Sequence, residues 1–160
     1  MGGQTIMAAK KAPVFKLADQ TGQERTLADL SGPKGLILYV YPKDSTSGCT
    51  LEAQEFRDHL PDFKQAGYQV AGLSKDSVKS HQNFAGKHDL GFPLLSDPEA
   101  GLIKALGSWG EKKMAGKTYE GIIRSTYVLD TRGHLVKTYA GVKAKGHAAQ
   151  VLADLADSGK

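Results

Sequence analysis

The only cysteine of the chain, Cys49, lies in the stretch YPKDSTSGCT at residues 41–50. A lone Cys is most often a small buried apolar residue. Here, however, the polar residues before it are typical helix caps, and with Thr46 as N-cap the thiol falls in the first turn of a helix. Unpaired backbone N–H groups and the helix dipole favour negative charge there. Since the thiolate is the reactive form of cysteine, this position predicts a nucleophilic Cys49.

Spacing argues against three familiar cysteine or metal chemistries. A cysteine protease needs a nearby His, but His59 lies ten residues along the same predicted helix, about 15 Å away. A Cys-x5-Arg phosphate loop would need Arg where Glu55 stands. His81 and His88 are seven residues apart, about 10 Å along a helix and too far to bind one metal ion. Only the fold could bring the more distant histidines to Cys49, namely His81, His88, His134 and His147.

The stretch GEKKMAGKT at residues 110–118 ends like a phosphate-binding loop. That motif requires four residues between its first Gly and the Gly-Lys-Thr end, whereas five separate Gly110 from Gly116. No predicted strand precedes it. We therefore interpret this stretch as a solvated loop without bound nucleotide.

The elements that would position Cys49 follow from apolar periodicity. Strand patterns and helix patterns alternate along the first two thirds of the chain. Strands are expected at 36–41, 68–74 and 92–97. Helices are expected at 49–65 with a kink or break at Pro61, at 76–89 with an Asp or Ser cap, and at 98–107 with Pro98 in the first turn. A hairpin at 124–141, turning near Gly133, and a helix at 146–157 complete the chain. This order predicts a mixed sheet with helices on both faces. Cys49 follows the first strand, where open α/β sheets place ligands.

Length and composition indicate one globular domain. The chain has 160 residues, of which 40% are hydrophobic and 24% charged, enough for a core without disulfides or metals. We expect a flexible N-terminal tail at residues 1–12 and one domain at residues 13–160. A single Cys excludes an internal disulfide, and a reducing, cytoplasmic location is the expectation.

The charge pattern argues against nucleic-acid and membrane partners. The formal net charge is +4, but the basic residues alternate with acidic ones and form no patch. No apolar run approaches the roughly 20 residues of a membrane span. We expect neither nucleic-acid binding nor a membrane association.

The pattern PKDSTSGC at residues 42–49 resembles the active-site signature of peroxiredoxins. The longer stretch YPKDSTSGCTLEAQEFRD is similar to the peroxiredoxin Q group, also called bacterioferritin comigratory proteins. Residues 70–84 and 111–130 also resemble that group, and the resemblance runs from about residue 13 to residue 157. It implies a thioredoxin-like α/β fold, with a central mixed sheet flanked by helices.

The resemblance also implies roles for five residues. Cys49 would be the peroxidatic nucleophile. Thr46 would bond the thiolate or the peroxide while capping the helix, and Pro42 would fix the loop and shield the site from water. Arg124 would stabilise the thiolate and orient the peroxide oxygens. Glu52 would hold that Arg.

The chain departs from the group at the second, resolving cysteine. The positions where relatives commonly carry it hold Gln54 and Ala85. Ser47 also replaces a Pro that is usual before the Gly of the signature. Two alternatives stay open: the chain works with one Cys and an external thiol, or a natural second Cys has been replaced in this sequence.

The function implied by the resemblance is a thiol-dependent peroxidase. It would reduce hydrogen peroxide and organic hydroperoxides through a Cys49 sulfenic acid, and thioredoxin, glutaredoxin or glutathione would restore the thiol. No cofactor and no metal are implied, and we expect a monomer because the group is often monomeric. The alternative is a non-enzymatic thioredoxin-fold module that binds partners or senses redox state through Cys49.

Overall fold

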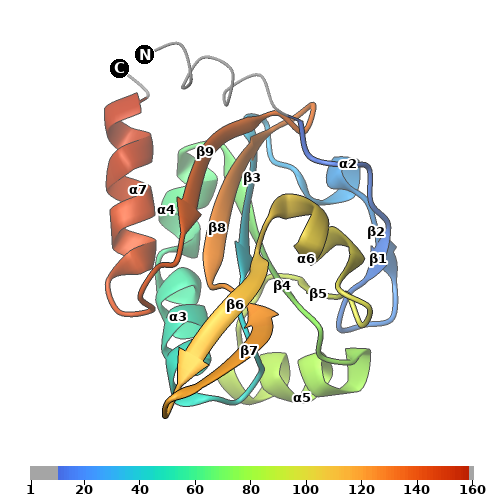
Figure 1. The fold of residues 1–160 in the computed structure, drawn as a ribbon. Coiled ribbons are helices and arrows are strands. Elements are labelled where there is room, and N and C mark those ends of the chain that lie inside the picture. Colours follow the sequence, from blue (N-terminus) through green and yellow to red (C-terminus); the bar gives the residue numbers. More distant parts are fainter. Residues whose placement is uncertain (1–10, 159–160) are drawn as a thin grey trace.

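The computed structural model describes residues 11–158, and its centre is a five-stranded mixed sheet (Figure 1). Strands β3, β4 and β5 are parallel, whereas β8 pairs antiparallel with β3, and β9 antiparallel with β8. The sheet order is β5-β4-β3-β8-β9. The bounds are Gly35–Val40 for β3, Tyr68–Ser74 for β4, Leu94–Ser96 for β5, Ser125–Asp130 for β8 and Leu135–Ala140 for β9. The predicted mixed sheet is therefore confirmed.

Helices cover both faces of this sheet, as the element order predicted. In Figure 1, α3, α4 and α7 lie on one side and α2 and α6 on the other. The bounds are Leu27–Leu30 for α2, Ser47–Asp58 for α3, Leu60–Gln65 for α4, Val78–His88 for α5, Gly101–Leu106 for α6 and His147–Ser158 for α7. A small sheet of β1 (Leu17–Ala18) and β2 (Glu24–Arg25) completes the α2 side. None of the helices within residues 11–158 has the length and apolarity that a membrane span requires.

Strand β3 is buried along its whole length, because each face of the sheet carries its own core. Leu36, Leu38 and Val40 pack with the α6 side chains. Ile37 and Tyr39 pack with residues of α3, α4, α5 and α7. Alternate side chains of a strand point to opposite faces, so an apolar run such as LILYV suits a central strand. This strand leads directly into the loop before α3, the helix that carries Cys49.

Two helix boundaries were predicted with different success. The break near Pro61 is confirmed, because α3 ends at Asp58 and Pro61 lies in the first turn of α4. The expected Pro98 start of α6 is wrong: the helix begins at Gly101 after Ala100, whose φ is +59°. Residues 98 and 99 form a turn instead.

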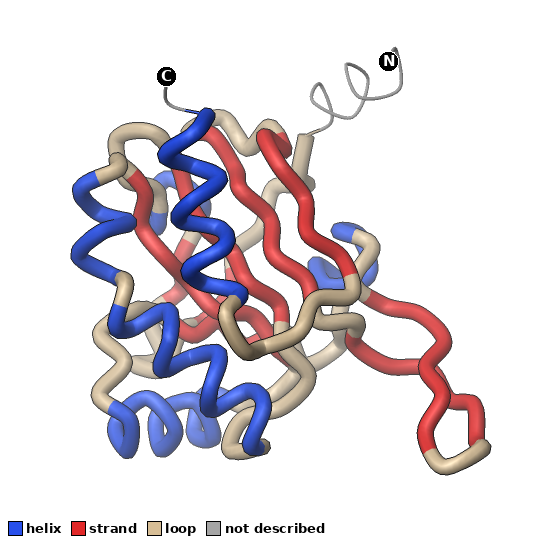
Figure 2. Tube along the Cα trace, turned by 90° about the vertical axis from the view of Figure 1, so that its left-hand side faces the viewer, coloured by secondary structure: helices blue, strands red, loops and turns tan. Residues whose placement is uncertain are grey.

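The prediction of a solvated loop around GEKKMAGKT is also wrong. This stretch forms a hairpin of β6 (Trp109–Met114) and β7 (Lys117–Ile122), which projects from the body of the molecule in Figure 2. Ala115 and Gly116 connect the strands with φ values of +53° and +78°. Two positive φ values are what a type I′ hairpin turn requires. The sequence concealed the hairpin because Lys, Glu and Gly are poor strand formers.

The expected N-terminal tail is only partly within the described residues. Residues 1–10 lie outside them. Lys11 forms an isolated bridge with His134, and the backbone N–H of Ala12 donates to the carbonyl of Gly133. The last two tail residues therefore contact the β8–β9 turn.

Replacing Gly35 by Ala is expected to destabilise the fold by about 3 kcal/mol. Gly35 has a φ of +153°, and a Cβ there would lie 1.8 Å from the carbonyl oxygen of Leu129 in the neighbouring strand. Urea unfolding measures the effect. The control is Gly86→Ala in α5, where a Cβ meets no atom within 4 Å and the helix should gain up to about 1 kcal/mol. Equal unfolding midpoints for Gly35→Ala and wild type would contradict this close approach of β3 to β8.

Candidate active site

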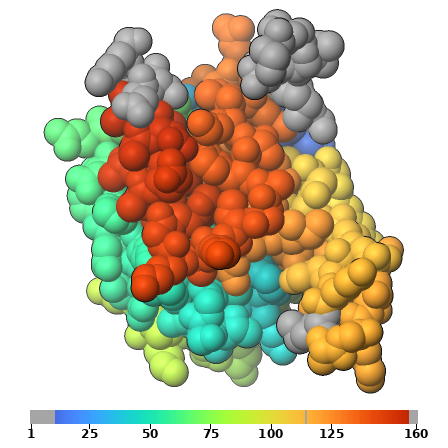
Figure 3. Space-filling model, turned by 60° about the vertical axis from the view of Figure 1, so that its left-hand side comes forward, coloured from blue at the N-terminus to red at the C-terminus, as the bar shows by residue number. Residues whose placement is uncertain are grey.

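Cys49 is the third residue of α3, whose N-cap is Thr46. The predicted position in the first helical turn is thus confirmed. The thiol is only 1% exposed, although Thr46 and Ser47 beside it are exposed. In Figure 3, the start of α3 (cyan) reaches the surface between the C-terminal helix and the β6–β7 hairpin. Cys49 therefore lies just beneath the surface, at the end of the loop that leaves β3.

The hydroxyl of Thr46 does not make the bonds expected of it. It donates to the carbonyl oxygen of Lys43 at 2.9 Å, and it makes no capping bond with the helix. No hydrogen bond joins Thr46 to Cys49 among the described residues. The physical reason is local, because the side chain turns back into its own loop and satisfies a carbonyl there. Thr46 is thus the N-cap residue by position, without a side-chain capping bond or a bond to the thiol, and the bond from its hydroxyl to a peroxide stays a prediction.

Arg124 approaches the Cys49 sulfur from the segment between β7 and β8. Its Nη2 donates to Sγ at 3.3 Å, and its Nη1 donates to Oε1 of Glu52 at 2.5 Å. Gly48 permits this approach, because a Cβ there would lie 3.2 Å from Nη2, tighter than most packing contacts allow. The structure thus brings together three residues singled out in the sequence: Cys49, Glu52 and Arg124.

Glu52 sits one turn beyond Cys49 on the same helix and is 1% exposed. Burial raises the pKa of its carboxyl to about 7, although the charge and hydrogen bond of Arg124 oppose the rise. Burial tends to lower the pKa of Arg124, but the negative charges of Glu52 and Cys49 outweigh it and the pKa is raised. The guanidinium is therefore a fixed cation. Oε2 of Glu52 has no hydrogen-bond partner within residues 11–158, so the carboxyl holds Arg124 through Oε1.

The raised pKa of Glu52 predicts a pH-dependent effect of Glu52→Gln on stability. A carboxyl whose folded pKa exceeds its unfolded value stabilises the fold most below the unfolded pKa, here 4.5, and this contribution is lost as pH rises through about 7. Neutral Gln has no such loss. We expect wild type and Glu52→Gln to be similarly stable at pH 5, and the variant to be more stable by about 3 kcal/mol at pH 8.5.

Urea unfolding at several pH values tests this, with Glu55→Gln as the control in the same helix, since Glu55 is more exposed. A stability difference between Glu52→Gln and wild type that stays constant from pH 5 to 8.5 would contradict the assignment. Peroxide turnover should fall in Glu52→Gln above about pH 7, where the wild-type carboxyl is ionised and anchors Arg124 as an anion, and should differ less from wild type at pH 5.

His147, at the start of α7, lies near this cluster, and no motif or spacing in the sequence indicated that position. Its Nε2 lies 2.7 Å from Oγ1 of Thr126, and its ring packs edge-on against Phe56 and Tyr139. Burial and then the charge of Arg124 lower the pKa of His147 to about 4. It is therefore neutral at physiological pH and adds no second cation beside Arg124.

The remaining predicted positions are Pro42, Gln54 and Ala85. Pro42 is half-buried directly after Tyr41. Gln54 is half-buried on α3, with Nε2 at 3.4 Å from Nδ1 of His88. Ala85 is half-buried on α5 and packs against the core under α3. No hydrogen bond connects these three side chains to Cys49.

One group of described side chains has the spacing of a metal site: Asp44, Asp76 and His81, with ligand atoms within 4.8 Å of one another. These atoms are engaged in hydrogen bonds. His81 Nδ1 lies 2.7 Å from Asp44 Oδ2, and Asp76 Oδ2 accepts from the Asp44 N–H at 2.8 Å. The geometry is that of a hydrogen-bonded cluster rather than an open metal centre.

Known proteins resemble this chain along nearly its whole length. Residues 8–138 match the model of the AhpC/TSA family. The Bacillus subtilis protein Peroxiredoxin Bcp is 43% identical over 153 residues, covering 96% of this chain and 97% of that protein. The Escherichia coli protein of the same name is 39% identical over 147 residues, covering 92% and 94%.

Solved structures agree with these sequence matches. A structure of Xanthomonas campestris peroxiredoxin Q superposes with a TM-score of 0.83 at 44% identity, covering 91% of this chain and 92% of that one. A second structure, described as a trapped intermediate or ligand complex that bears on alkyl peroxide reduction by the Xanthomonas bacterioferritin comigratory protein, has a TM-score of 0.84 at 43% identity and the same coverage. The thioredoxin-like fold expected from the sequence is thereby confirmed.

Proposed function

Because this chain belongs to the AhpC/TSA family and, within it, to the peroxiredoxin Q group, we propose that it is a thiol peroxidase with Cys49 as its nucleophile. The observation that carries the proposal is the 3.3 Å contact between Arg124 Nη2 and Cys49 Sγ. A fixed guanidinium stabilises a thiolate and offers further N–H donors to an incoming peroxide. The helix N-terminus supports the same negative charge.

The proposed reaction is a displacement at oxygen. The Cys49 thiolate attacks the terminal oxygen of ROOH, an S–O bond forms and the O–O bond breaks. Sulfur is oxidised to sulfenic acid, and the leaving alkoxide takes a proton and departs as ROH. Charge moves from sulfur to the leaving oxygen in this step, so donors that are already in place lower the barrier. Among the described side chains, Arg124 donates a hydrogen bond to the sulfur, and Glu52 holds the guanidinium of Arg124 in place.

Return to the thiol requires a reductant from outside the chain, because Cys49 is the only cysteine. An external thiol condenses with the sulfenic acid, forming a mixed disulfide and releasing water. A second thiol then releases Cys49 and leaves a disulfide of the two reductants. Thioredoxin, glutaredoxin and glutathione supply this chemistry, and we propose one of them as the physiological partner, acting in the cytoplasm on a monomeric enzyme.

Without reductant, the lone cysteine is expected to over-oxidise. A Cys49 sulfenic acid has no partner cysteine in its chain, so excess peroxide converts it to sulfinic and sulfonic acids. Mass spectrometry should show gains of about 32 and 48 Da on the peptide that holds Cys49, for two and three added oxygens. Cys49→Ser provides the control peptide, which should stay unchanged. An unmodified Cys49 after prolonged exposure to peroxide would overturn the proposed function.

A further inference from the structure

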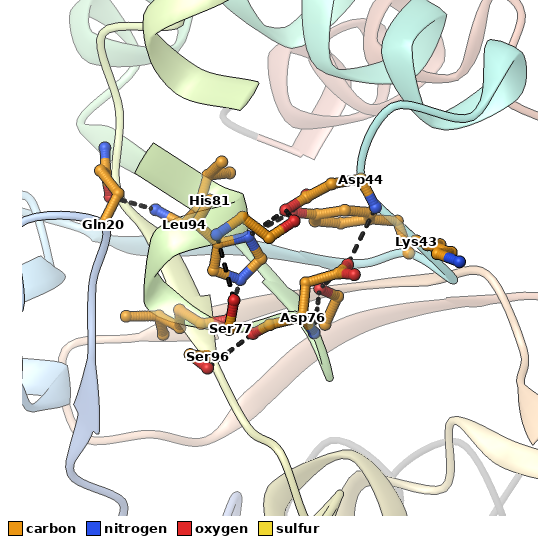
Figure 4. A network of polar contacts seen from close by, with 12 residues as sticks. Gln20, Lys43, Asp44, Asp76, Ser77, His81, Leu94 and Ser96 are labelled. Atoms are coloured by element: carbon orange, nitrogen blue, oxygen red, sulfur yellow. Dashed lines mark hydrogen bonds and ion pairs between the residues drawn. The ribbon is translucent and has the colours of Figure 1, made fainter. Parts of the chain in front are cut away.

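A second cluster of polar side chains, outside the Cys49 cluster, surrounds Asp44 in the loop that joins β3 to α3. The Asp44 carboxylate accepts hydrogen bonds from Tyr41 OH at 2.6 Å and from Ser80 Oγ at 2.8 Å. It also lies 2.7 Å from His81 Nδ1. Its backbone N–H donates to Asp76 Oδ2 at 2.8 Å. Figure 4 shows Asp44 between His81 and Asp76. Residues of α5 and of the β4–α5 loop, together with Tyr41, thus fix one residue of the β3–α3 loop.

His81 belongs to this cluster and is fully buried. Its Nε2 lies 3.0 Å from the carbonyl oxygen of Leu95 in β5. A carbonyl oxygen only accepts, so Nε2 carries a proton. Nδ1 faces the Asp44 carboxylate, which also only accepts when ionised. His81 therefore donates from Nε2 to β5 and shares a hydrogen bond between Nδ1 and the Asp44 carboxyl, and so joins β5, through α5, to the β3–α3 loop.

The two residues after Asp44 show why this loop needs to be held. Ser45 has a φ of +66°, a left-handed conformation that costs an L-residue free energy and persists where the surrounding structure imposes it. Thr46 follows as the N-cap of α3. The conformation of Ser45 thus sets the direction in which α3 leaves the loop, and with it the position of Cys49.

Cys49 lies at the start of α3 and Arg124 between β7 and β8. Their 3.3 Å contact therefore requires that both segments keep a fixed position. Glu52 fixes the Arg124 side. We propose that His81 is a positioning residue for the peroxidatic cysteine: by clamping Asp44, it holds the β3–α3 loop in the geometry that presents the Cys49 sulfur to Arg124. This inference rests on the proposed function of Cys49.

Two substitutions at position 81 separate positioning from general stability. The Asn amide nitrogen occupies the place of Nδ1, so His81→Asn keeps a donor toward Asp44 and loses the bond to Leu95. The Gln amide nitrogen occupies the place of Nε2, so His81→Gln keeps the bond to Leu95 and loses the one to Asp44. Each variant loses one buried hydrogen bond, and both should be destabilised to a similar degree.

The readout is the rate constant of Cys49 oxidation by hydrogen peroxide, measured in stopped flow and compared with urea unfolding of the same samples. We expect His81→Asn to keep the wild-type rate within about threefold and His81→Gln to lose at least about tenfold. Equal rates in the two variants, whether both fast or both slow, would overturn the inference.

A second pair of variants tests the same point if position 81 does not tolerate substitution. Ser80→Ala removes a donor to Asp44 from the partly buried start of α5, and a several-fold slower oxidation is expected. Ser77→Ala removes the side-chain N-cap of α5, which accepts from Ser80 N at 3.1 Å, but Ser77 makes no hydrogen bond to Asp44. It should reduce stability and leave the rate unchanged. A rate that falls with stability in both variants, or a wild-type rate for Ser80→Ala, would overturn the inference.

The wild-type rate keeps the two proposals distinguishable. If wild-type Cys49 reacts no faster than free cysteine, the proposed function fails and this inference fails with it. If the wild type is fast but the variants do not separate as described, the peroxidase stands and the role of His81 is refuted.

Discussion

Arg124→Lys is expected to lower the rate of peroxide reduction by at least about 100-fold, equivalent to roughly 2.7 kcal/mol in the barrier. Arg124 uses two nitrogens of one rigid plane, Nη2 toward the Cys49 sulfur and Nη1 toward Glu52. Lys has the same charge but a single nitrogen on a flexible stem, so it does not hold both contacts in fixed geometry. The loss should appear in the oxidation step, seen by stopped flow, rather than in the reduction by thiol.

Arg132→Lys is the matched control, because Arg132 is exposed in the β8–β9 turn. It should retain the wild-type rate and stability. Arg124→Lys should remain folded, since its side chain is replaced by one of similar length and charge. If its oxidation rate stays within about twofold of wild type, a change of only ~0.4 kcal/mol, Arg124 does not act on the reacting atoms.

Features that depend on neighbouring residues were predictable from the sequence. The buried strand β3, the helix start at Thr46 and the break near Pro61 each follow from a local pattern of apolar, capping or imino residues. The β6–β7 hairpin was not predictable in this way. Its turn, at Ala115 and Gly116, depends on backbone angles that Ala rarely adopts, and its strands are rich in Lys and Glu.

Features that depend on contacts between distant segments needed the structure or a family resemblance. Arg124 lies 75 residues from Cys49 in sequence, and only the resemblance connected them. His81 lies 37 residues from Asp44, and neither residue carried a signal of its own: spacing argued only against His81 as a metal ligand, and Asp44 was one polar residue in a loop. Thr46 is the opposite case: a side-chain bond to the start of α3 was expected from the local sequence, but the hydroxyl bonds the carbonyl oxygen of Lys43 in its own loop.

The rate at which Cys49 is oxidised decides between a peroxidase and a redox-sensing module. An ordinary thiol with a pKa of about 8.5 is roughly 3% ionised at pH 7, so full ionisation by itself accelerates oxidation by at most about 30-fold. Any larger acceleration requires stabilisation of the transition state, which we assign to Arg124 and the helix N-terminus.

The most direct measurement is therefore the second-order rate constant for loss of the Cys49 thiol in hydrogen peroxide at pH 7, with free cysteine measured under the same conditions. We expect a constant at least about 1,000-fold above that of free cysteine, equivalent to roughly 4 kcal/mol of barrier lowering in total, with one thiol consumed per chain. A constant within about 30-fold of free cysteine would show a thiol that is at most ionised, and would contradict the claim that this site is built to reduce peroxides.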